Sequence, residues 1–194
     1  MEIERKLLSV YFPRPPHIIM ITPYFRQIDA EEDDNNKSRR GANISYRLSS
    51  GNGLSKIFKS FPTNDDVAKW LERVHRQFTN ITRIFTIGSS VEGRQQQGLV
   101  VSLTAKHKSN KPAIWINGAV HAREWATVPS VLNVIYQLVT GANSRTRDLI
   151  DKFEWYLVPV FNPDGYAYSQ VADRMWRKNR RPLGRCNGQY ILSW

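Results

Sequence analysis

The sequence predicts an α/β protein, a layered fold with a mixed, mostly buried β-sheet flanked by helices. Segments with strand patterns alternate along the chain with segments whose apolar residues recur at helical spacing. The last strand segment, residues 155–161, is an almost unbroken apolar run, which is typical of a strand covered on both faces by helices. With 194 residues and 41% hydrophobic content, the chain is long enough to bury one sizeable core.

The first helix is predicted to begin at Thr63 or Asn64, because either side chain is a good helix cap. Asp65 and Asp66 then fall in its first turn, where acidic residues are favoured. The apolar residues that follow recur at helical spacing and are expected to face the core: Val67, Trp70, Leu71, Val74 and Phe78.

Two strands are predicted next, at residues 83–87 and 99–103, and the stretch 88–98 predicts a turn or loop that joins them as a hairpin. After a polar turn at 106–111, residues 113–117 predict a third strand. A second helix has a broad apolar face from Val128 to Leu138 and a natural stop at Gly141. A short helix near 146–153 leads into the strand at 155–161.

Composition divides the chain into three parts. Residues 26–55 are rich in Asp, Asn, Ser, Gly and Arg without apolar periodicity, so we predict that 1–57 is an N-terminal extension and largely a disordered linker. Residues 58–186 form the predicted domain, and 187–194 form a divergent tail. No stretch approaches the roughly 20 apolar residues of a membrane span. Prolines at positions 13, 15 and 16 interrupt the N-terminal apolar stretch, which makes it a poor secretory signal.

The chain carries a formal net charge of +11, which suggests an anionic partner. Arginine and lysine residues crowd around Trp176, an arrangement that can follow phosphates and stack bases. A non-catalytic binding module for nucleic acid or protein is therefore one alternative, and a solvated basic surface is another. The lone Cys186 is either a free thiol or half of a bridge.

A possible metal site follows the strand at 113–117. His121 and Glu124 lie three residues apart, in the loop where open α/β sheets gather ligands at the carboxyl ends of their strands. Zinc takes nitrogen and oxygen ligands of these types, and zinc-bound water becomes a nucleophile near neutral pH. The pair therefore suggests a metallohydrolase. The alternative is that His121 only forms a hydrogen bond in the loop and Glu124 caps the next helix.

Four segments in this order, 87–94, 118–125, 162–166 and 174–178, closely resemble the zinc metallocarboxypeptidases typified by pancreatic carboxypeptidases A and B. The resemblance runs from about residue 58 to 186 and implies a partial carboxypeptidase-like domain. It implies a secreted or extracellular enzyme that removes the C-terminal residue of peptides or proteins with a zinc-activated water. Nucleic acid is not a partner that this family implies.

The resemblance also assigns roles to individual residues. It implies that His121 and Glu124 are two ligands of a single Zn²⁺ ion and that Arg177 stabilises the oxyanion of the scissile carbonyl. Arg123 and Arg174 resemble residues that line the substrate subsites. For 162–166 we predict a structural role, a tight turn formed by Pro-Asp-Gly after a buried strand.

Several parts of the family pattern are not found in this sequence. The family's third zinc ligand, its general-base glutamate, its closing tyrosine and its Asn-Arg carboxylate clamp have no counterparts, so the zinc ligand set is incomplete. The remaining histidines at 17, 75 and 107 are not expected to replace the missing ligand. We therefore expect a C-terminally truncated carboxypeptidase that is inactive or nearly so, with a sheet that has a bare edge.

Overall fold

The computed structural model describes residues 19–21, 53–105, 110–141, 144–186 and 189–192. His17, His107 and most of the predicted linker lie outside these ranges. In chain order the elements are β1 (Ile19–Ile21), the 3-10 helix η1 (Leu54–Lys59), α2 (Asn64–Gln77), β2 (Thr82–Ser89), β3 (Gln95–Val101), β4 (Ala113–Asn117), α3 (Thr127–Thr140), α4 (Ser144–Lys152), β5 (Glu154–Val158), α5 (Pro163–Val171), β6 (Pro182–Cys186) and β7 (Gln189–Leu192).

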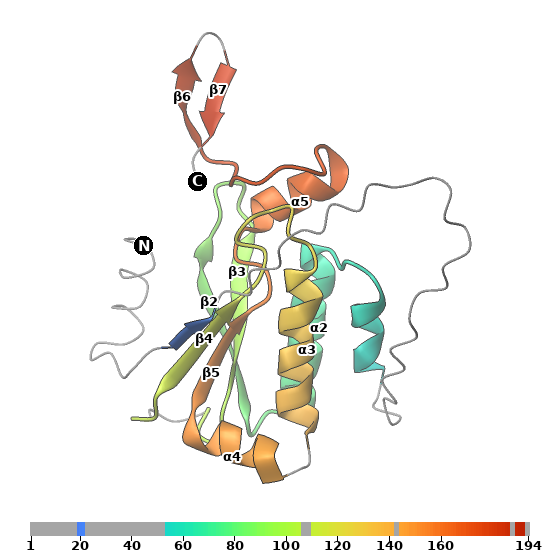
Figure 1. Ribbon diagram of the computed structural model, residues 1–194, viewed down its shortest axis with the longest axis vertical. Coiled ribbons are helices and arrows are strands. Elements are labelled where there is room, and N and C mark those ends of the chain that lie inside the picture. The colour runs from blue at the N-terminus through green and yellow to red at the C-terminus, as the bar shows by residue number, and fades with distance from the viewer. Residues whose placement is uncertain (1–18, 22–52, 106–109, 142–143, 187–188, 193–194) are drawn as a thin grey trace.

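Within the described residues, the main sheet has five strands in the order β1-β4-β5-β3-β2 (Figure 1). β4 runs parallel to β1 and β5, whereas β3 runs antiparallel to both β5 and β2, which confirms the mixed sheet. β4 and β5 lie next to each other in the interior of the sheet, and Ile116 pairs with Leu157 near their carboxyl ends. β6 and β7 form a separate hairpin that projects from the molecule (Figure 1).

Two described segments belong to the predicted N-terminal extension. Ile19–Ile21 pairs with Ile114–Ile116 of β4, so β4 is not the edge strand of the described sheet at these residues. Leu54–Lys59 forms η1, in which Leu54 is buried and accepts a hydrogen bond from Trp70 Nε1 at its backbone oxygen. The predicted domain boundary at residue 58 therefore falls within a helix that packs on the core.

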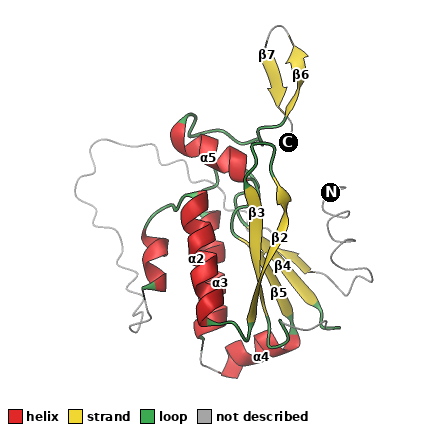
Figure 2. Cartoon of the chain, turned by 180° about the vertical axis from the view of Figure 1, so that it is seen from behind, coloured by secondary structure: helices red, strands yellow, loops and turns green. Residues whose placement is uncertain are grey.

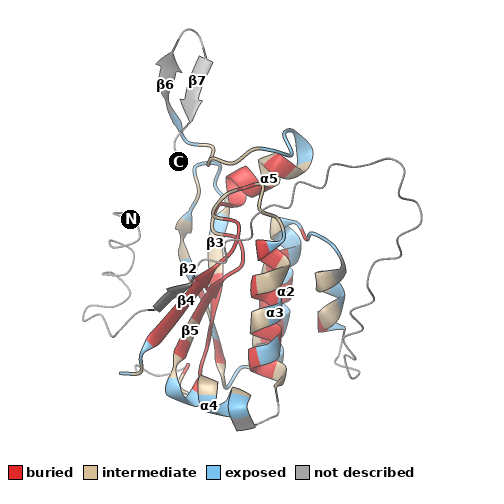
Figure 3. Cartoon of the chain, in the orientation of Figure 1, coloured by how far each residue is buried: buried red, intermediate tan, exposed pale blue. Residues whose placement is uncertain are grey.

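One face of the sheet carries helices α2 and α3 (Figure 2). The apolar sides of these helices and the strands beneath them are buried (Figure 3). The described residues place no helix on the opposite face, so the prediction that helices cover β5 on both faces is not met there. Aromatic rings fill part of that second face instead, since Trp115 stacks on Tyr156 and Phe85 meets both rings edge-on.

Local sequence signals explain where the elements begin. Thr63 caps α2, because its hydroxyl accepts from the Asp66 N–H at 3.2 Å while the Asp66 carboxylate accepts from the Thr63 N–H at 3.0 Å. The Thr63 hydroxyl also donates to Asp66 Oδ2 at 2.7 Å, and this hydrogen bond, followed by that of the Thr63 N–H, lowers the pKa of Asp66. Gly141 ends α3 as predicted. β3 begins at Gln95, earlier than predicted, because three glutamines pair with β2 although their sequence reads as a loop.

No helix in the part of the chain that the structure describes is both long enough and apolar enough to cross a lipid bilayer.

Candidate active site

Backbone hydrogen bonds join the carboxyl ends of β4 and β5 where the candidate site begins. Gly118 N–H donates to the Val158 carbonyl at 2.9 Å, and Phe161 N–H donates back to the Gly118 carbonyl at 2.9 Å. A side chain at Gly118 would lie 2.6 Å from the Pro159 carbonyl oxygen, so glycine is required by this close approach. The chain then turns sharply through Ala119, whose φ of 47° is in the left-handed region.

His121 and Glu124 lie on the turn that follows, and their side chains point toward each other. His121 Nδ1 is 2.9 Å from Glu124 Oε1, and the side chains are 27% and 14% exposed. Thr127 fixes this turn, because its hydroxyl donates to the Glu124 carbonyl at 2.6 Å and accepts from the Ala119 N–H at 2.7 Å. The structure therefore brings together the two residues that the sequence singles out, at the predicted end of a central strand.

Arg177 reaches the same histidine from a segment far away in the sequence. Its NH2 lies 3.0 Å from His121 Nε2, and its backbone carbonyl accepts from the Ala122 N–H at 3.1 Å. A guanidinium can only donate, so in this contact Nε2 accepts and the imidazole proton lies on Nδ1, directed at Glu124. Ligation of a metal through Nδ1 would require the proton on Nε2 and therefore the loss of the Arg177 contact. The three predicted residues form one continuous polar chain.

His121 and Glu124 can supply two ligands of a zinc ion, which is part of a complete ligand set. Two ligands at about 2.0–2.1 Å from a tetrahedral zinc ion lie about 3.3 Å apart, so the observed 2.9 Å needs only a small adjustment. Among the described residues, no group of three or more His, Cys, Asp or Glu side chains could hold a metal ion. His75 cannot complete the set, because it lies on α2 with its Nδ1 3.0 Å from the Thr82 hydroxyl.

Arg123 and Arg174 are near His121 and Glu124 in the fold but make different contacts. The Arg174 guanidinium carbon lies 3.8 Å from the centre of the Trp125 ring, and its NH1 donates to the Arg123 carbonyl at 2.9 Å. Trp125 is held in turn by its hydrogen bond to the Ser169 hydroxyl at 2.8 Å. Neither arginine contributes to the pocket that adjoins His121.

That pocket has a volume of about 350 Å³ and opens between the β2–β3 loop, the carboxyl ends of β4 and β5, and the segment after α5. Its lining residues are Ser89, Ser90, Val91, Gln96, Val120, His121, Phe161, Asn162, Pro163, Asp164, Arg177, Lys178, Asn179, Arg180 and Arg181.

The predicted tight turn at residues 162–166 is wrong, because this segment begins helix α5. Asn162 caps the helix through its side-chain oxygen, which accepts from the Gly165 N–H at 3.0 Å, and Pro163 occupies the first turn. The Asn162 amide nitrogen also donates to the Lys178 carbonyl at 3.1 Å. A Cβ at Gly165 would lie 2.4 Å from that same carbonyl oxygen, so the segment after α5 packs directly on its start.

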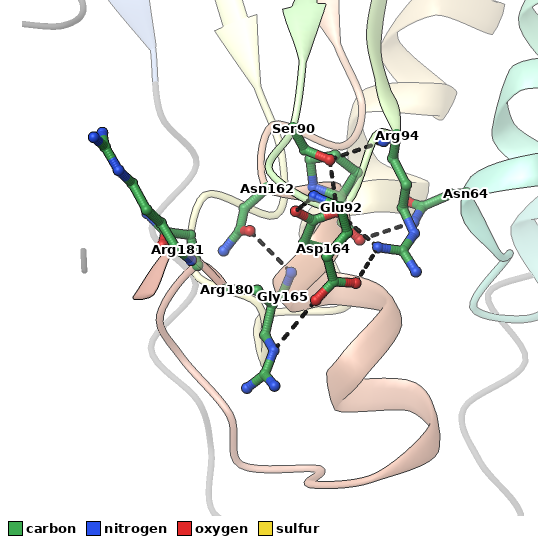
Figure 4. A network of polar contacts seen from close by, with 11 residues as sticks. Asn64, Ser90, Glu92, Arg94, Asn162, Asp164, Gly165, Arg180 and Arg181 are labelled. Carbon is green, nitrogen blue, oxygen red and sulfur yellow. Dashed lines mark hydrogen bonds and ion pairs between the residues drawn. The ribbon is translucent and has the colours of Figure 1, made fainter. Parts of the chain in front are cut away.

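Asp164 is the residue that sequence reasoning missed. Its carboxylate is 3% exposed and accepts hydrogen bonds from the Ser90 hydroxyl at 2.6 Å, the Glu92 N–H at 2.9 Å and Arg94 NH1 at 2.7 Å (Figure 4). Glu92 and then Asp164 raise the pKa of Arg94. The sequence signal for Asp164 is a Pro-Asp-Gly run directly after a buried strand. The partners of Asp164 on the β2–β3 loop lie about 70 positions earlier, so the run does not reveal them.

Sequence comparison identifies a family profile and curated relatives that match this chain. A family profile described as zinc carboxypeptidase matches residues 67–190. The chain is 35% identical over 122 residues to a zinc carboxypeptidase of Simulium vittatum, covering 63% of this chain and 39% of the relative. It is 38% identical over 136 residues to the inactive metallocarboxypeptidase ecm14 of Schizosaccharomyces pombe, covering 66% and 27%. It therefore spans well under half the length of these relatives.

Comparison with solved structures also finds carboxypeptidase folds that resemble this chain. Carboxypeptidase A from Helicoverpa armigera superposes with a TM-score of 0.62 at 33% identity, over 66% of this chain and 31% of that one. Thrombin-activatable fibrinolysis inhibitor superposes with a TM-score of 0.63 at 29% identity, over 72% and 35%. Because the family profile covers more than half of the chain, the chain belongs to the zinc carboxypeptidase family.

Proposed function

We propose that His121 and Glu124 are two ligands of a zinc ion in a metallocarboxypeptidase site. The observation that carries this proposal is the approach of His121 Nδ1 to Glu124 Oε1 at 2.9 Å, at the carboxyl end of a central strand. When bound, zinc would polarise the carbonyl of a C-terminal peptide bond and lower the pKa of a bound water. Peptide or protein C-termini are the proposed substrates.

Arg177 is the residue that we assign to transition-state stabilisation. Its guanidinium lies 3.0 Å from the proposed ligand His121 and lines the same pocket, where a donor can reach a developing oxyanion. Because a guanidinium carries only hydrogen-bond donors, it can stabilise an oxyanion without a proton transfer. Arg123 and Arg174 are proposed as substrate-side residues on the basis of the family resemblance. Secretion is proposed on the same basis.

We further propose that the 194-residue polypeptide by itself hydrolyses peptides very slowly or not at all. The described residues offer two zinc ligands at one place, and loss of even a supporting residue around a zinc ion typically costs about 10–100-fold in metal affinity or activity. Two of its relatives, from Schizosaccharomyces pombe and Saccharomyces cerevisiae, are named inactive metallocarboxypeptidases. Their names support the proposal.

The test separates metal binding from hydrolysis. Zinc binding is measured by equilibrium dialysis on the purified 194-residue protein and on His121→Ala, Glu124→Gln and a histidine control, His75→Ala. We expect weak binding that falls at least about tenfold in the first two variants and is unchanged in the control. Equal binding by all four proteins would refute the ligand assignment.

Hydrolysis is measured with a peptide whose C-terminus is free and with the same peptide amidated. We expect no zinc-dependent release of the terminal residue from either peptide. Chelator-sensitive release from the free peptide alone would show that the isolated polypeptide is an active carboxypeptidase and that our expectation is wrong.

A further inference from the structure

The tripeptide Asn80-Ile81-Thr82 has the form Asn-X-Thr, and its middle residue is not proline. This pattern is the acceptor sequence for N-linked glycans, which in secreted proteins are attached to surface loops. Two further tripeptides of this type, Asn36-Lys37-Ser38 and Asn43-Ile44-Ser45, lie outside the described residues. Asn80 is therefore the acceptor candidate whose surroundings the structure describes.

Asn80 lies on the surface, in the turn that joins α2 to β2. This turn comprises residues 79–81, and both Thr79 and Asn80 are exposed. The two residues that follow face inward, since Ile81 packs against the hydrophobic core and Thr82 is 1% exposed. Surface loops of this kind tolerate added groups because little else packs on them. A glycan on Asn80 would extend into solvent and leave the core contacts of its neighbours unchanged.

The folded turn buries the hydroxyl that completes the acceptor tripeptide. The Thr82 hydroxyl donates to the Phe78 carbonyl at 2.7 Å, and the Ile81 N–H donates to the same carbonyl at 3.1 Å. The Ser102 N–H donates to the Ile81 carbonyl at 2.9 Å and joins the turn to the chain after β3. Because Thr82 is inaccessible to an enzyme in this arrangement, a glycan must be added before the turn folds.

Asn80 and the pocket beside His121 lie at opposite ends of β2. The strand begins at Thr82, and its last residue, Ser89, lines the pocket. Eight strand residues span roughly 25 Å. A glycan on Asn80 would therefore leave the pocket open.

We propose that Asn80 carries an N-linked glycan when the chain passes through the secretory pathway. The proposal rests on the secretion proposed above and needs neither zinc nor peptide hydrolysis. The glycan donor is an oligosaccharide linked to a lipid through a pyrophosphate. The amide nitrogen of Asn80 forms a bond to C1 of the first sugar and loses one proton to a base of the transferase. The bond from C1 to the phosphate oxygen breaks, and its electron pair leaves with the lipid pyrophosphate.

The test expresses the 194-residue chain in cultured eukaryotic cells behind a cleavable signal peptide. Because the signal peptide supplies entry into the secretory pathway, a failure of the proposed native secretion cannot be mistaken for a failure of Asn80 as an acceptor. The purified protein is treated with peptide-N-glycosidase F in H₂¹⁸O, which converts a glycosylated asparagine to an ¹⁸O-labelled aspartate. Trypsin then releases residues 77–83, a peptide in which Asn80 is the one asparagine. We expect mass spectrometry to find the labelled aspartate at position 80.

Variants provide a second measurement. Asn80→Gln should lower the mass of the intact protein by one glycan, whereas Asn110→Gln, the same change at an exposed asparagine outside any acceptor tripeptide, should leave the glycan mass unchanged. The double variant Asn36→Gln/Asn43→Gln should keep one glycan that the glycosidase removes. If the 77–83 peptide of the wild-type protein contains only unmodified asparagine, the proposal is refuted, whether or not the other tripeptides carry glycans. A label that also appears without the glycosidase comes from spontaneous deamidation and equally refutes it.

Discussion

The substitution Asp164→Asn tests whether one buried carboxylate holds the β2–β3 loop against the pocket. In the wild-type protein Ser90 and Arg94 donate to Oδ1, and the Glu92 N–H donates to Oδ2. An asparagine keeps the size of the side chain but replaces one oxygen with a donor. When the amide oxygen keeps the position of Oδ1, the new amide nitrogen takes the position of Oδ2. This nitrogen then faces the Glu92 N–H and leaves that N–H without an acceptor.

The magnitude follows from these contacts. An unsatisfied buried donor costs about 1–3 kcal/mol. Loss of the ion pair to Arg94 adds about 1 kcal/mol, because that side chain is 37% exposed and the pair is partly screened. We therefore expect the free energy of unfolding to fall by about 2–4 kcal/mol, measured by urea denaturation with tryptophan fluorescence.

The control is Asp151→Asn, which makes the same chemical change in an exposed ion pair with Lys111. Asp151 is 65% exposed, so its loss should cost less than about 1 kcal/mol. Hydrogen exchange supplies a local measurement. In Asp164→Asn the Glu92 amide should lose protection, whereas the protection of amides in the interior of α3 should fall only by the change in global stability. If Asp164→Asn and Asp151→Asn destabilise equally and the Glu92 amide stays protected, the anchoring role of Asp164 is wrong.

Two further predictions concern the ends of helices. Thr63→Ala should lower the free energy of unfolding by about 1 kcal/mol near pH 7. Because the Thr63 hydrogen bonds lower the pKa of Asp66, their contribution is complete above the unfolded pKa of 3.8 and is lost as the pH falls through the lower folded value. Urea denaturation across this range should show the difference between wild type and variant shrinking in acid to the part that comes from the pH-independent hydrogen bond of the Asp66 N–H to the Thr63 hydroxyl, and a constant difference would contradict this origin. Gly165→Ala should destabilise by about 1–3 kcal/mol, because its Cβ would lie 2.4 Å from the Lys178 carbonyl oxygen. Gly88→Ala, where a Cβ meets nothing within 4 Å, is the control, and equal thermal stability of the two variants would refute the packing argument.

Much of the fold could be predicted from the sequence because its signals are local. Thr63 and Asp66 are three residues apart and define the start of α2 through contacts between themselves. The apolar residues of β4 and the periodic face of α3 likewise lie within single elements, and the structure confirms both. The pairing of His121 with Glu124 is also local, since one turn of the chain separates them.

Predictions failed where a long-range contact overrides local preference. Pro-Asp-Gly at 163–165 has the composition of a turn, yet the segment forms a helix, because Asn162 caps it and Asp164 finds partners on the β2–β3 loop. The glutamines at the start of β3 favour a loop, but pairing with β2 makes them a strand. In both places a partner on another element contributes, and at α5 the Asn162 cap is a local signal that already indicated the start of a helix.

The sequence alone determined α2, α3 and α4, strands β2 to β5 and the two donors of the candidate metal site, but it predicted neither η1 nor α5. The tertiary structure alone decided that Arg177 meets His121 at 3.0 Å and that the basic segment around Trp176 becomes one wall of a pocket. The physical reason is the range of the interactions. Backbone preferences, caps and periodicity act between near neighbours in the chain, whereas a pocket forms only when the sheet and α5 bring distant segments together.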